Sequence, residues 1–354
     1  MHVSIMAEMH VSIMKEQLKK IRTHTKLFCI ICNSKGIQKY HNLRDRLFGV
    51  SGSWQIRECS NVSCRHLWLD PSPINEDIHL AYAEYFTHQD NAQLNVSFLQ
   101  KIVLAYQAHH YQYPVRNIEQ FHRFLSFLLS QFKFFKEYMD YPFVYFKGLK
   151  KGKFLELGAG SGEMLSQFKD LGFNVEGLDL DLKAVKRAKQ KGLKMHHGDI
   201  FSRKFKANHY DIIFSSHFIE HVPDPIKVIK ESLRILRKNG TFIAITPNTS
   251  SFLHRCLKSK WLNLDPPRHL HMFNADQLTK LMQHAGYKTI EVKSGNYSAA
   301  TVFYYSLNAN YWHNRWSIKA LVLRLLSLIV RLCLNILHYF YPLSGEEIIL
   351  IAKK

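Results

Sequence analysis

The sequence has few acidic side chains. Asp and Glu number 28 in 354 residues, against 48 Lys and Arg, so the formal charge at pH 7 is +20 and the pI is about 9.6. A chain this basic favours partners that carry negative charge, such as nucleic acid, anionic lipid head groups or phosphate-bearing substrates. Net charge alone does not choose among these partners.

Two further features are missing. The first residues hold no basic segment followed by a long apolar run, which argues against a secretory signal and for a cytoplasmic protein with reduced thiols. They hold two near-copies instead, MHVSIMAE and MHVSIMKE, with Met1, Met9 and Met14 as equivalent start residues. Eight residues bury too little surface to fold, so we interpret the copies as a duplicated leader within an N-terminal extension, residues 1–24, and not as a docking segment. The rest of the chain shows no longer internal repeat.

Four of the six cysteines lie in two close pairs near the N-terminus. Cys29 and Cys32 form C-x2-C, and Cys59 and Cys64 form C-x4-C. Such pairs, separated by a strand-rich segment, are typical of a structural zinc ribbon with four thiolate ligands, here expected over residues 25–72. Disulfides are the alternative. A zinc with four thiolates has no open position, so this site predicts a small rigid domain without metal catalysis.

Helices are expected over residues 73–150, as a connector between the ribbon and the following domain. The segment FHRFLSFLLSQFKFFKEYMDY has apolar side chains at three- and four-residue spacing. This pattern predicts an apolar helical face that packs against the next domain, with a lid over an apolar substrate as the alternative. The face comprises Phe121, Leu125, Leu128, Phe132, Phe135 and Met139.

Strands, turns and helices alternate from residue 151 onward. The segment KFLELGAGSGEML starts as an apolar strand and then breaks into Gly158, Gly160 and Gly162 before a helical run. Glycines at this spacing permit a sharp turn and a close backbone approach to a ligand, and the helix that follows adds N–H donors. The next strand, NVEGLDLD, includes Asp179, near the position at which an acidic residue binds ribose hydroxyls in nucleotide-binding folds. The third strand ends in GDI, where Asp199 and Ile200 suit the amine and face of an adenine.

Five segments in this order resemble the successive motifs of class I S-adenosylmethionine-dependent methyltransferases. They are LELGAGSG, GLDLD, GDI, YDIIFSSHFIEHVPDP and LRKNGTFIAITPN, and they cover about residues 150–295. The resemblance implies an α/β fold with a Rossmann-like, doubly wound sheet of seven strands in residues 151–354. It also implies contacts of Glu156 with the methionine amine, of the glycine turn with the methionine backbone, of Asp179 with the ribose, and of Asp199 and Ile200 with the adenine. Ser215, at the end of the fourth strand, completes the expected cofactor set.

The resemblance extends to a group of bacterial enzymes in which a zinc-ribbon module precedes the methyltransferase domain. RECSNVSCRHLWLDPSP is similar to that module, and LDPPRHLHMF is similar to a later segment of the same group. Arg65 stands where the ribbon usually has glycine, which is a departure from the pattern.

The segment HFIEH, residues 217–221, has the H-x-x-E-H form of inverted zinc peptidases. Pro223 and Pro225 would end a helix within about a turn, and no third zinc ligand is evident on a following helix, so we do not expect peptidase activity. Two interpretations remain: a shaped loop without chemical role, or a histidine that removes the acceptor's proton. His217 and His221 are the candidate bases, His269 and His271 are second candidates, and a divalent metal at the Glu220/His221 pair is a variant.

Residues 318–341, within an expected insertion at about 297–344, form a long apolar run. Its polar members, Arg324, Ser327, Arg331, Asn335 and His338, recur every three or four residues. Arginines inside the run argue against a membrane span. We expect either a helix in the membrane interface with its arginines at anionic head groups, or a helix buried against the sheet.

The function expected from these features is methyl transfer from S-adenosylmethionine, most simply O-methylation of a small molecule, a sugar or a lipid-linked glycan precursor. A cytoplasmic protein, peripheral at the inner membrane, follows from the apolar run. Methylation of RNA, base or ribose, is the alternative, favoured by the charge. The Asn/Asp-Pro-Pro-Tyr sequence of amino-directed base methylases is absent, and residues 215–218 read Ser-Ser-His-Phe.

Overall fold

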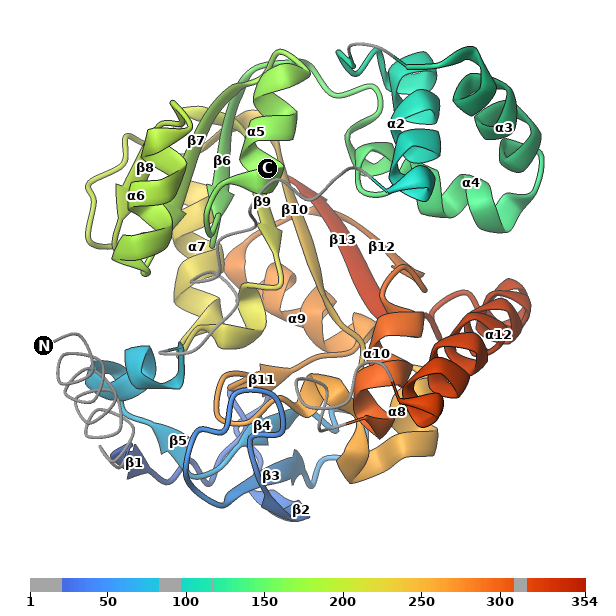
Figure 1. Cartoon of the computed structure of the whole chain (residues 1–354). Coiled ribbons are helices and arrows are strands. Elements are labelled where there is room, and N and C mark those ends of the chain that lie inside the picture. Colours follow the sequence, from blue (N-terminus) through green and yellow to red (C-terminus); the bar gives the residue numbers. More distant parts are fainter. Residues whose placement is uncertain (1–20, 83–96, 116–117, 309–316) are drawn as a thin grey trace, which may run out of the picture.

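The computed structural model describes residues 21–82, 97–115, 118–308 and 317–354. The tandem copy at the N-terminus lies outside the described residues. Figure 1 shows a central sheet with helices on both faces, a small second sheet below it, and two helical segments at one side.

A seven-stranded sheet forms the centre, in the order β12-β13-β10-β9-β6-β7-β8. Strand β13 runs antiparallel to both neighbours, β10 and β12, while the strands from β10 to β8 are parallel. This confirms the doubly wound sheet that the sequence predicts. The strands are β6 (Lys153–Leu157), β7 (Asn174–Asp179), β8 (Met195–His197), β9 (Tyr210–Ser216), β10 (Leu236–Pro247), β12 (Thr289–Gly295) and β13 (Glu347–Lys353).

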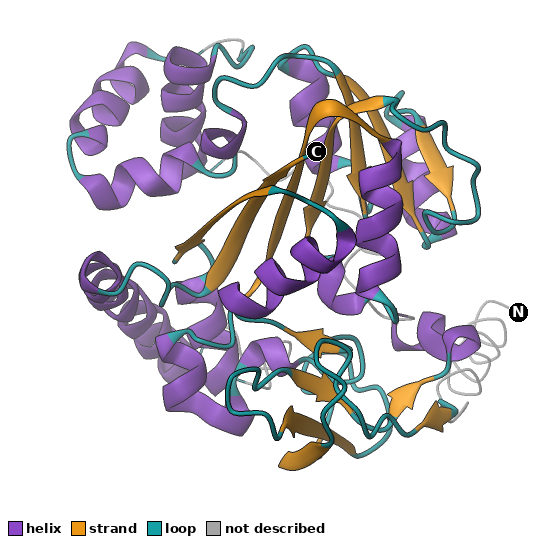
Figure 2. Ribbon diagram, turned by 180° about the vertical axis from the view of Figure 1, so that it is seen from behind, coloured by secondary structure: helices purple, strands orange, loops and turns teal. Residues whose placement is uncertain are grey.

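Each face of the sheet has its own apolar core, because successive residues of a strand point to opposite faces. Phe154 faces α5 (Glu163–Asp170), α6 (Leu182–Gln190) and η3 (Phe143–Phe146). Leu155 belongs to the other core, with α7 (Pro225–Ile235) and α9 (Ala275–Ala285). Figure 2 shows the resulting three layers from behind.

The N-terminal module is a four-stranded sheet that borrows a strand from far along the chain. Its order is β11-β4-β3-β2, comprising β2 (Gly36–Leu43), β3 (Trp54–Cys59), β4 (Leu67–Leu69) and β11 (His271–Met272). A short pair, β1 (Thr23–His24) with β5 (Ser72–Pro73), lies beside it. Because β11 comes from the PPRHLHMF segment, the module and the methyltransferase-like half share one sheet.

Helices follow the module, as predicted, but the long apolar segment is two helices and not one. After η1 (Asn75–Tyr82) and α2 (Phe98–Tyr111), the chain forms α3 (Gln120–Ser130), breaks, and continues as α4 (Lys133–Asp140). Leu125, Phe135 and Met139 pack in a small core with α2. The expectation that the whole face packs is wrong, because Phe121, Leu128 and Phe132 are exposed, as are Phe124 and Phe127 beside them.

Among the described residues between β12 and β13, the structure has the helices α10 (Ala299–Leu307) and α12 (Ile318–Phe340). They lie next to α8 (Phe252–Leu257), η5 (Lys258–Lys260) and η6 (Leu262–Leu264). Helix α12 is long and apolar enough to cross a membrane by length and composition, with a mean hydropathy of 2.2. Burial against the sheet, one of the two expectations, is wrong: only Ala320, Ser327 and Leu334 are buried on it.

Candidate functional site

The glycine turn lies at the carboxyl end of β6, beside the carboxyl ends of β7 and β9. Leu157 pairs with Leu178 on one side and Ser215 on the other, so the residues that follow these three meet at one edge. Gly158 has φ 72° and a Cβ there would meet the ring of Phe218 at 2.7 Å, so both conformation and space require glycine. Open α/β sheets bind their ligands at this edge.

Gly160 and Gly162 also adopt the left-handed backbone conformation, with φ 52° and 78°, and Gly162 is the residue before α5. Asp179 fixes the turn, because one of its oxygens accepts the Gly160 N–H at 2.7 Å and the other accepts the Asp181 N–H at 2.8 Å. The carboxylate for which the resemblance implies ribose contact thus also holds the loop for the methionine part. Burial raises the pKa of Asp179, against the effect of these two hydrogen bonds.

Glu156 is a buried carboxylate, 4% exposed, two residues before the turn. Its Oε2 has no hydrogen-bond partner among the described residues. Burial, and next the negative charge of Asp179, raise the pKa of Glu156 well above its ordinary value. An unpaired buried carboxylate costs free energy, and a cationic ligand group beside it would recover that cost.

Ser215, at the end of β9, is likewise fully buried with an Oγ that has no partner in the described part of the chain. Asp199 is exposed and caps the turn after β8 by accepting the Phe201 and Ser202 N–H groups, while Ile200 beside it is buried. The structure therefore gathers the predicted cofactor residues at the ends of β6, β7, β8 and β9.

Two exposed apolar side chains were missed by the sequence interpretation. Leu180 follows Asp179 and is 62% exposed, and Phe201 follows Ile200 and is 51% exposed. The His197 ring contacts the Leu180 carbonyl at 3.1 Å, which ties the ends of β7 and β8 together. Large apolar residues just beyond Asp179 and Asp199 were the available signal, since a planar base needs apolar surface on its faces.

His217 is held between two carboxylates. Its Nδ1 lies 3.3 Å from Glu220 Oε1 and its Nε2 lies 3.5 Å from Glu347 Oε1. Burial alone would lower the pKa of His217, but these two acids outweigh it and raise the pKa to about 10. At neutral pH this imidazole is charged, so it is not a free base. Its backbone has φ 48°, a strained conformation for a residue with a side chain.

His221 and His269 come together, and His217 stands outside their group. Ligand atoms of Glu220, His221 and His269 lie within 4.8 Å of one another. The two histidines that the peptidase pattern would pair are therefore not paired, and their helix is only the short turn η4 (Ile219–His221). The third member of the group, His269, comes from a loop and not from a following helix.

Each histidine of this group is oriented by a carbonyl. His221 Nδ1 lies 3.1 Å from Arg268 O, with Tyr82 Oη at 2.9 Å, and His269 Nδ1 lies 2.7 Å from Asn263 O. A carbonyl only accepts, so each Nδ1 carries a hydrogen, and in a neutral ring the lone pair is then on Nε2. Burial, and next the nearby His269, lower the pKa of His221 to about 4, so this imidazole is neutral at pH 7.

Arg268 joins the N-terminal module to this loop and was also missed. Its guanidinium is fully buried between Asp45, at 2.7 and 2.8 Å, and Asp265, at 2.6 and 2.9 Å, and it donates to the Ala81 carbonyl at 3.2 Å. Arg268 lies in the PPRHL segment that the sequence analysis singled out, but its partner Asp45 is 223 residues away in the chain.

Tyrosines line the side of the site next to Glu347. The rings of Tyr141 and Tyr297 stack with centroids 3.7 Å apart, and Tyr138 stacks on Tyr297 at 5.5 Å. Burial, and next the charge of Glu347, raise the pKa of Tyr141 well above its ordinary value. An aromatic surface therefore adjoins the charged His217 pair.

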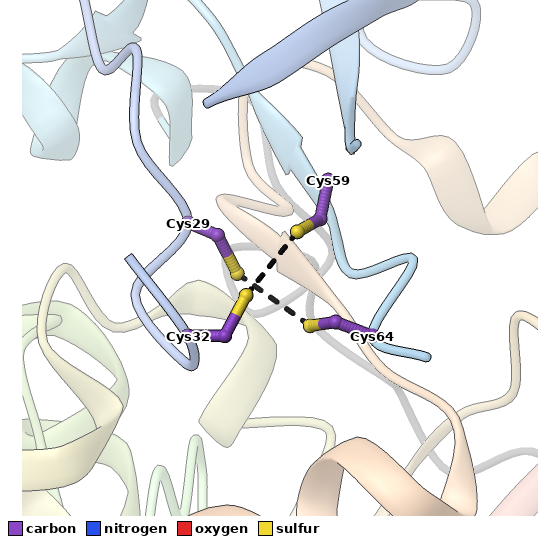
Figure 3. A group of neighbouring side chains, drawn as sticks. All are labelled: Cys29, Cys32, Cys59 and Cys64. Carbon is purple, nitrogen blue, oxygen red and sulfur yellow. Dashed lines mark hydrogen bonds between the residues drawn. The ribbon is translucent and has the colours of Figure 1, made fainter. Parts of the chain in front are cut away.

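The four cysteines of the N-terminal module converge (Figure 3). The Sγ atoms of Cys29 and Cys64 are 3.7 Å apart, those of Cys32 and Cys59 are 3.3 Å apart, and all four lie within 4.8 Å. Four thiolates at about 2.3 Å from a tetrahedral zinc would be about 3.8 Å apart, so the donor set fits that ion. No disulfide joins them. Arg65 takes the left-handed conformation, φ 49°, that a glycine at its position would adopt freely.

The chain is similar in sequence to known methyltransferases. A family model for a methyltransferase domain matches residues 133–292. A ubiquinone biosynthesis O-methyltransferase of Aromatoleum aromaticum is 26% identical over 170 residues, 44% of this chain and 73% of that protein. A Mycolicibacterium smegmatis protein named as an S-adenosylmethionine-dependent methyltransferase is 31% identical over 136 residues, 38% of this chain and about half (51%) of its own length. A solved S-adenosylmethionine-dependent methyltransferase of Thermotoga maritima is 18% identical, with a TM-score of 0.42 over 71% of this chain and 98% of its own.

The family match covers the glycine turn, Asp179 and HFIEH, which are the segments that meet at the carboxyl edge of the sheet. Sheet order, turn and family match together identify the fold of a class I methyltransferase, with a methyltransferase domain over residues 133–292.

Proposed function

We propose that this enzyme transfers a methyl group from S-adenosylmethionine to a hydroxyl oxygen of a small molecule, a sugar or a lipid-linked glycan precursor. The observation that carries the proposal is a pair of buried atoms beside the glycine turn, Glu156 Oε2 and Ser215 Oγ, which have no hydrogen-bond partner in the part of the chain that the structure describes. The printed names of several relatives, ubiquinone biosynthesis O-methyltransferases, support oxygen as the acceptor atom.

In this proposal Glu156 pairs with the methionine amine, and Gly158, Gly160 and Gly162 let the backbone approach the methionine part. Asp179 binds the ribose while it keeps the Gly160 N–H. Asp199 takes the adenine amine, and Ile200, Leu180 and Phe201 supply the apolar surface for the ring. S-Adenosylmethionine supplies the methyl group when bound, and direct transfer needs mainly alignment of acceptor oxygen, methyl carbon and sulfur.

The acceptor's proton needs a destination as the new C–O bond forms and the C–S bond breaks. We assign the proton to His221 Nε2, because that nitrogen keeps its lone pair and its ring is neutral at pH 7. His269 is the second candidate. His217 cannot accept the proton, because Glu220 and Glu347 keep its ring protonated. His217 instead orients the acceptor through its charge, and a divalent cation at Glu220, His221 and His269 is an alternative way to ionise the hydroxyl.

Zinc at Cys29, Cys32, Cys59 and Cys64 would have a structural role. The module that it would close reaches the site directly, since β4 pairs with β11 and Gln277 donates to the Cys64 carbonyl. Through these contacts the ion would fix the loop that bears Arg268 and His269, and it would take no part in the chemistry.

The test is calorimetric titration of the purified protein with S-adenosylmethionine, beside Asp179→Ala, with the metal content measured on the same samples. Micromolar binding that Asp179→Ala abolishes supports the cofactor site. A radiolabelled-methyl screen then compares quinol, lipid-linked sugar and RNA acceptors. Label in RNA alone would overturn O-methylation of small acceptors, and absence of binding in a folded sample would overturn the proposal as a whole.

A further inference from the structure

Helix α12 presents its apolar side to the outside and its polar side to the protein. At about 100° per residue, twelve exposed apolar side chains fall on one half of its circumference. They are Ile318, Leu321, Val322, Leu325, Leu326, Leu328, Ile329, Leu332, Ile336, Leu337, Tyr339 and Phe340. A surface helix of a globular protein has the opposite arrangement, so this half of α12 requires an apolar partner.

The polar stripe of α12 is used by the protein itself. Arg331 lies over the ring of Tyr138, 4.7 Å from its centroid. Asn335 Oδ1 accepts a hydrogen bond from Asn296 Nδ2 at 3.0 Å, and His338 Nε2 is hydrogen-bonded to Ser294 Oγ at 3.1 Å. Arg324 likewise lies over the ring of Tyr304 at 5.7 Å, so both arginines contact the protein, which differs from the expected position at lipid head groups. These contacts also determine how α12 can lie relative to a membrane. A helix that crossed a bilayer would have to break them, whereas a helix that lies in the membrane interface keeps them all.

Charge favours an anionic partner. The sequence contains no Asp or Glu from residue 292 to residue 345, while Lys319, near the start of α12, is exposed within that stretch. Arg255, Lys258 and Lys260 are exposed on α8 and η5, and Phe252 of α8 touches Tyr341 at the end of α12. A second copy of the chain would bring two basic surfaces together, whereas an anionic bilayer would neutralise them.

A second apolar surface lies on the same side of the molecule. Helix α3 exposes Phe121, Phe124, Phe127 and Leu128, in a stretch without acidic residues from 120 to 136. Figures 1 and 2 both place α3 and α12 at one side of the central sheet. Aromatic and aliphatic side chains with basic neighbours are the composition that binds at the membrane–water interface.

We infer that α12, together with α3 on the same side of the molecule, docks on the surface of an anionic lipid bilayer, and that the acceptor is a lipid-borne molecule presented from that surface. The second half of this inference rests on the proposed O-methyl transfer. Its structural basis is a series of contacts that leads from α12 to the site. Arg331 covers Tyr138, Tyr138 stacks on Tyr297, and Tyr297 stacks on Tyr141. Glu347, which pairs with His217, is near enough to Tyr141 for its charge to help raise the pKa of that phenol.

The experiment is co-sedimentation of the full chain with phosphatidylcholine vesicles, with and without phosphatidylglycerol, in the absence of cofactor and acceptor. The variant Leu325→Glu/Ile329→Glu places two charges on the exposed half of α12, where both side chains are more than half exposed. Ile37→Glu/Val62→Glu places two charges on exposed apolar residues of the N-terminal module and serves as the matched control.

We expect the protein to sediment with the anionic vesicles, the α12 variant to lose at least tenfold in apparent partition coefficient, and the control to match the unmodified protein. An equal fall of the partition coefficient in both variants would mean that only net charge matters, and it would overturn α12 as the docking surface. A protein that stays in solution, or a dimer that only the α12 variant dissociates, would overturn lipid as the partner. Because calorimetry measures cofactor binding separately, failure here leaves the proposed methyl transfer standing.

Discussion

The buried ion pair between Arg268 and Asp45 allows a quantitative prediction. Both side chains are fully buried, and the guanidinium also bonds Asp265. Removing one partner of a buried pair typically costs about 3–5 kcal/mol, because the other charge stays buried. Arg268→Met leaves two carboxylates without their cation, so we expect the full 3–5 kcal/mol. At about 2 °C per kcal/mol, the unfolding midpoint should fall by about 6–10 °C.

Asp45→Asn should be milder, at about 1–3 kcal/mol, because Arg268 keeps Asp265 and the amide oxygen can still accept backbone N–H groups. Scanning calorimetry measures both variants, with Lys227→Met as the control, since the Lys227–Asp224 pair is exposed and should shift the midpoint by less than about 2 °C. Cofactor affinity should be unchanged in all three. The reasoning is refuted if Asp45→Asn is the more damaging change, or if Arg268→Met lies within the range of the surface control.

Three further outcomes are expected. Glu156→Gln should weaken S-adenosylmethionine about 10- to 100-fold in calorimetry without lowering the unfolding midpoint, and unmodified affinity should tighten as pH rises, because the raised pKa of Glu156 keeps it neutral at lower pH. Cys59→Ser should lower both zinc content by elemental analysis and the unfolding midpoint, whereas Cys256→Ser, at an exposed free cysteine, should change neither. His221→Asn should lower kcat about 10²- to 10⁴-fold with little change in the cofactor's KM. In the pH–rate profile of the unmodified enzyme, activity should fall on the acid side near pH 4 and not near pH 6.5, because burial lowers the pKa of His221. A fall in activity near pH 6.5 would show that His221 is not the base.

The sheet was predictable because its evidence is local. Each strand is a short apolar run, and the turn residues Gly158 and Asp179 follow those runs directly. Partners joined by the tertiary fold were not predictable: nothing near Arg268 indicates Asp45, and nothing near His217 indicates Glu347. Burial keeps His221 neutral, whereas the two carboxylates beside His217 outweigh burial and keep that ring charged. Helix α12 was the hardest case, since its periodicity fixes which residues share a stripe but not which side faces the protein.

The strand that the N-terminal module takes from residues 271–272 has a consequence for how such proteins can be divided or recombined. A cut after residue 72 would separate β11 from its neighbour β4 and expose the edge of β4, so neither product would keep the four-stranded sheet. An exchange of modules between relatives would have to carry the 263–273 loop along with the cysteines. The piece that can be inherited intact is therefore discontinuous in sequence, and its two parts are constrained to change together.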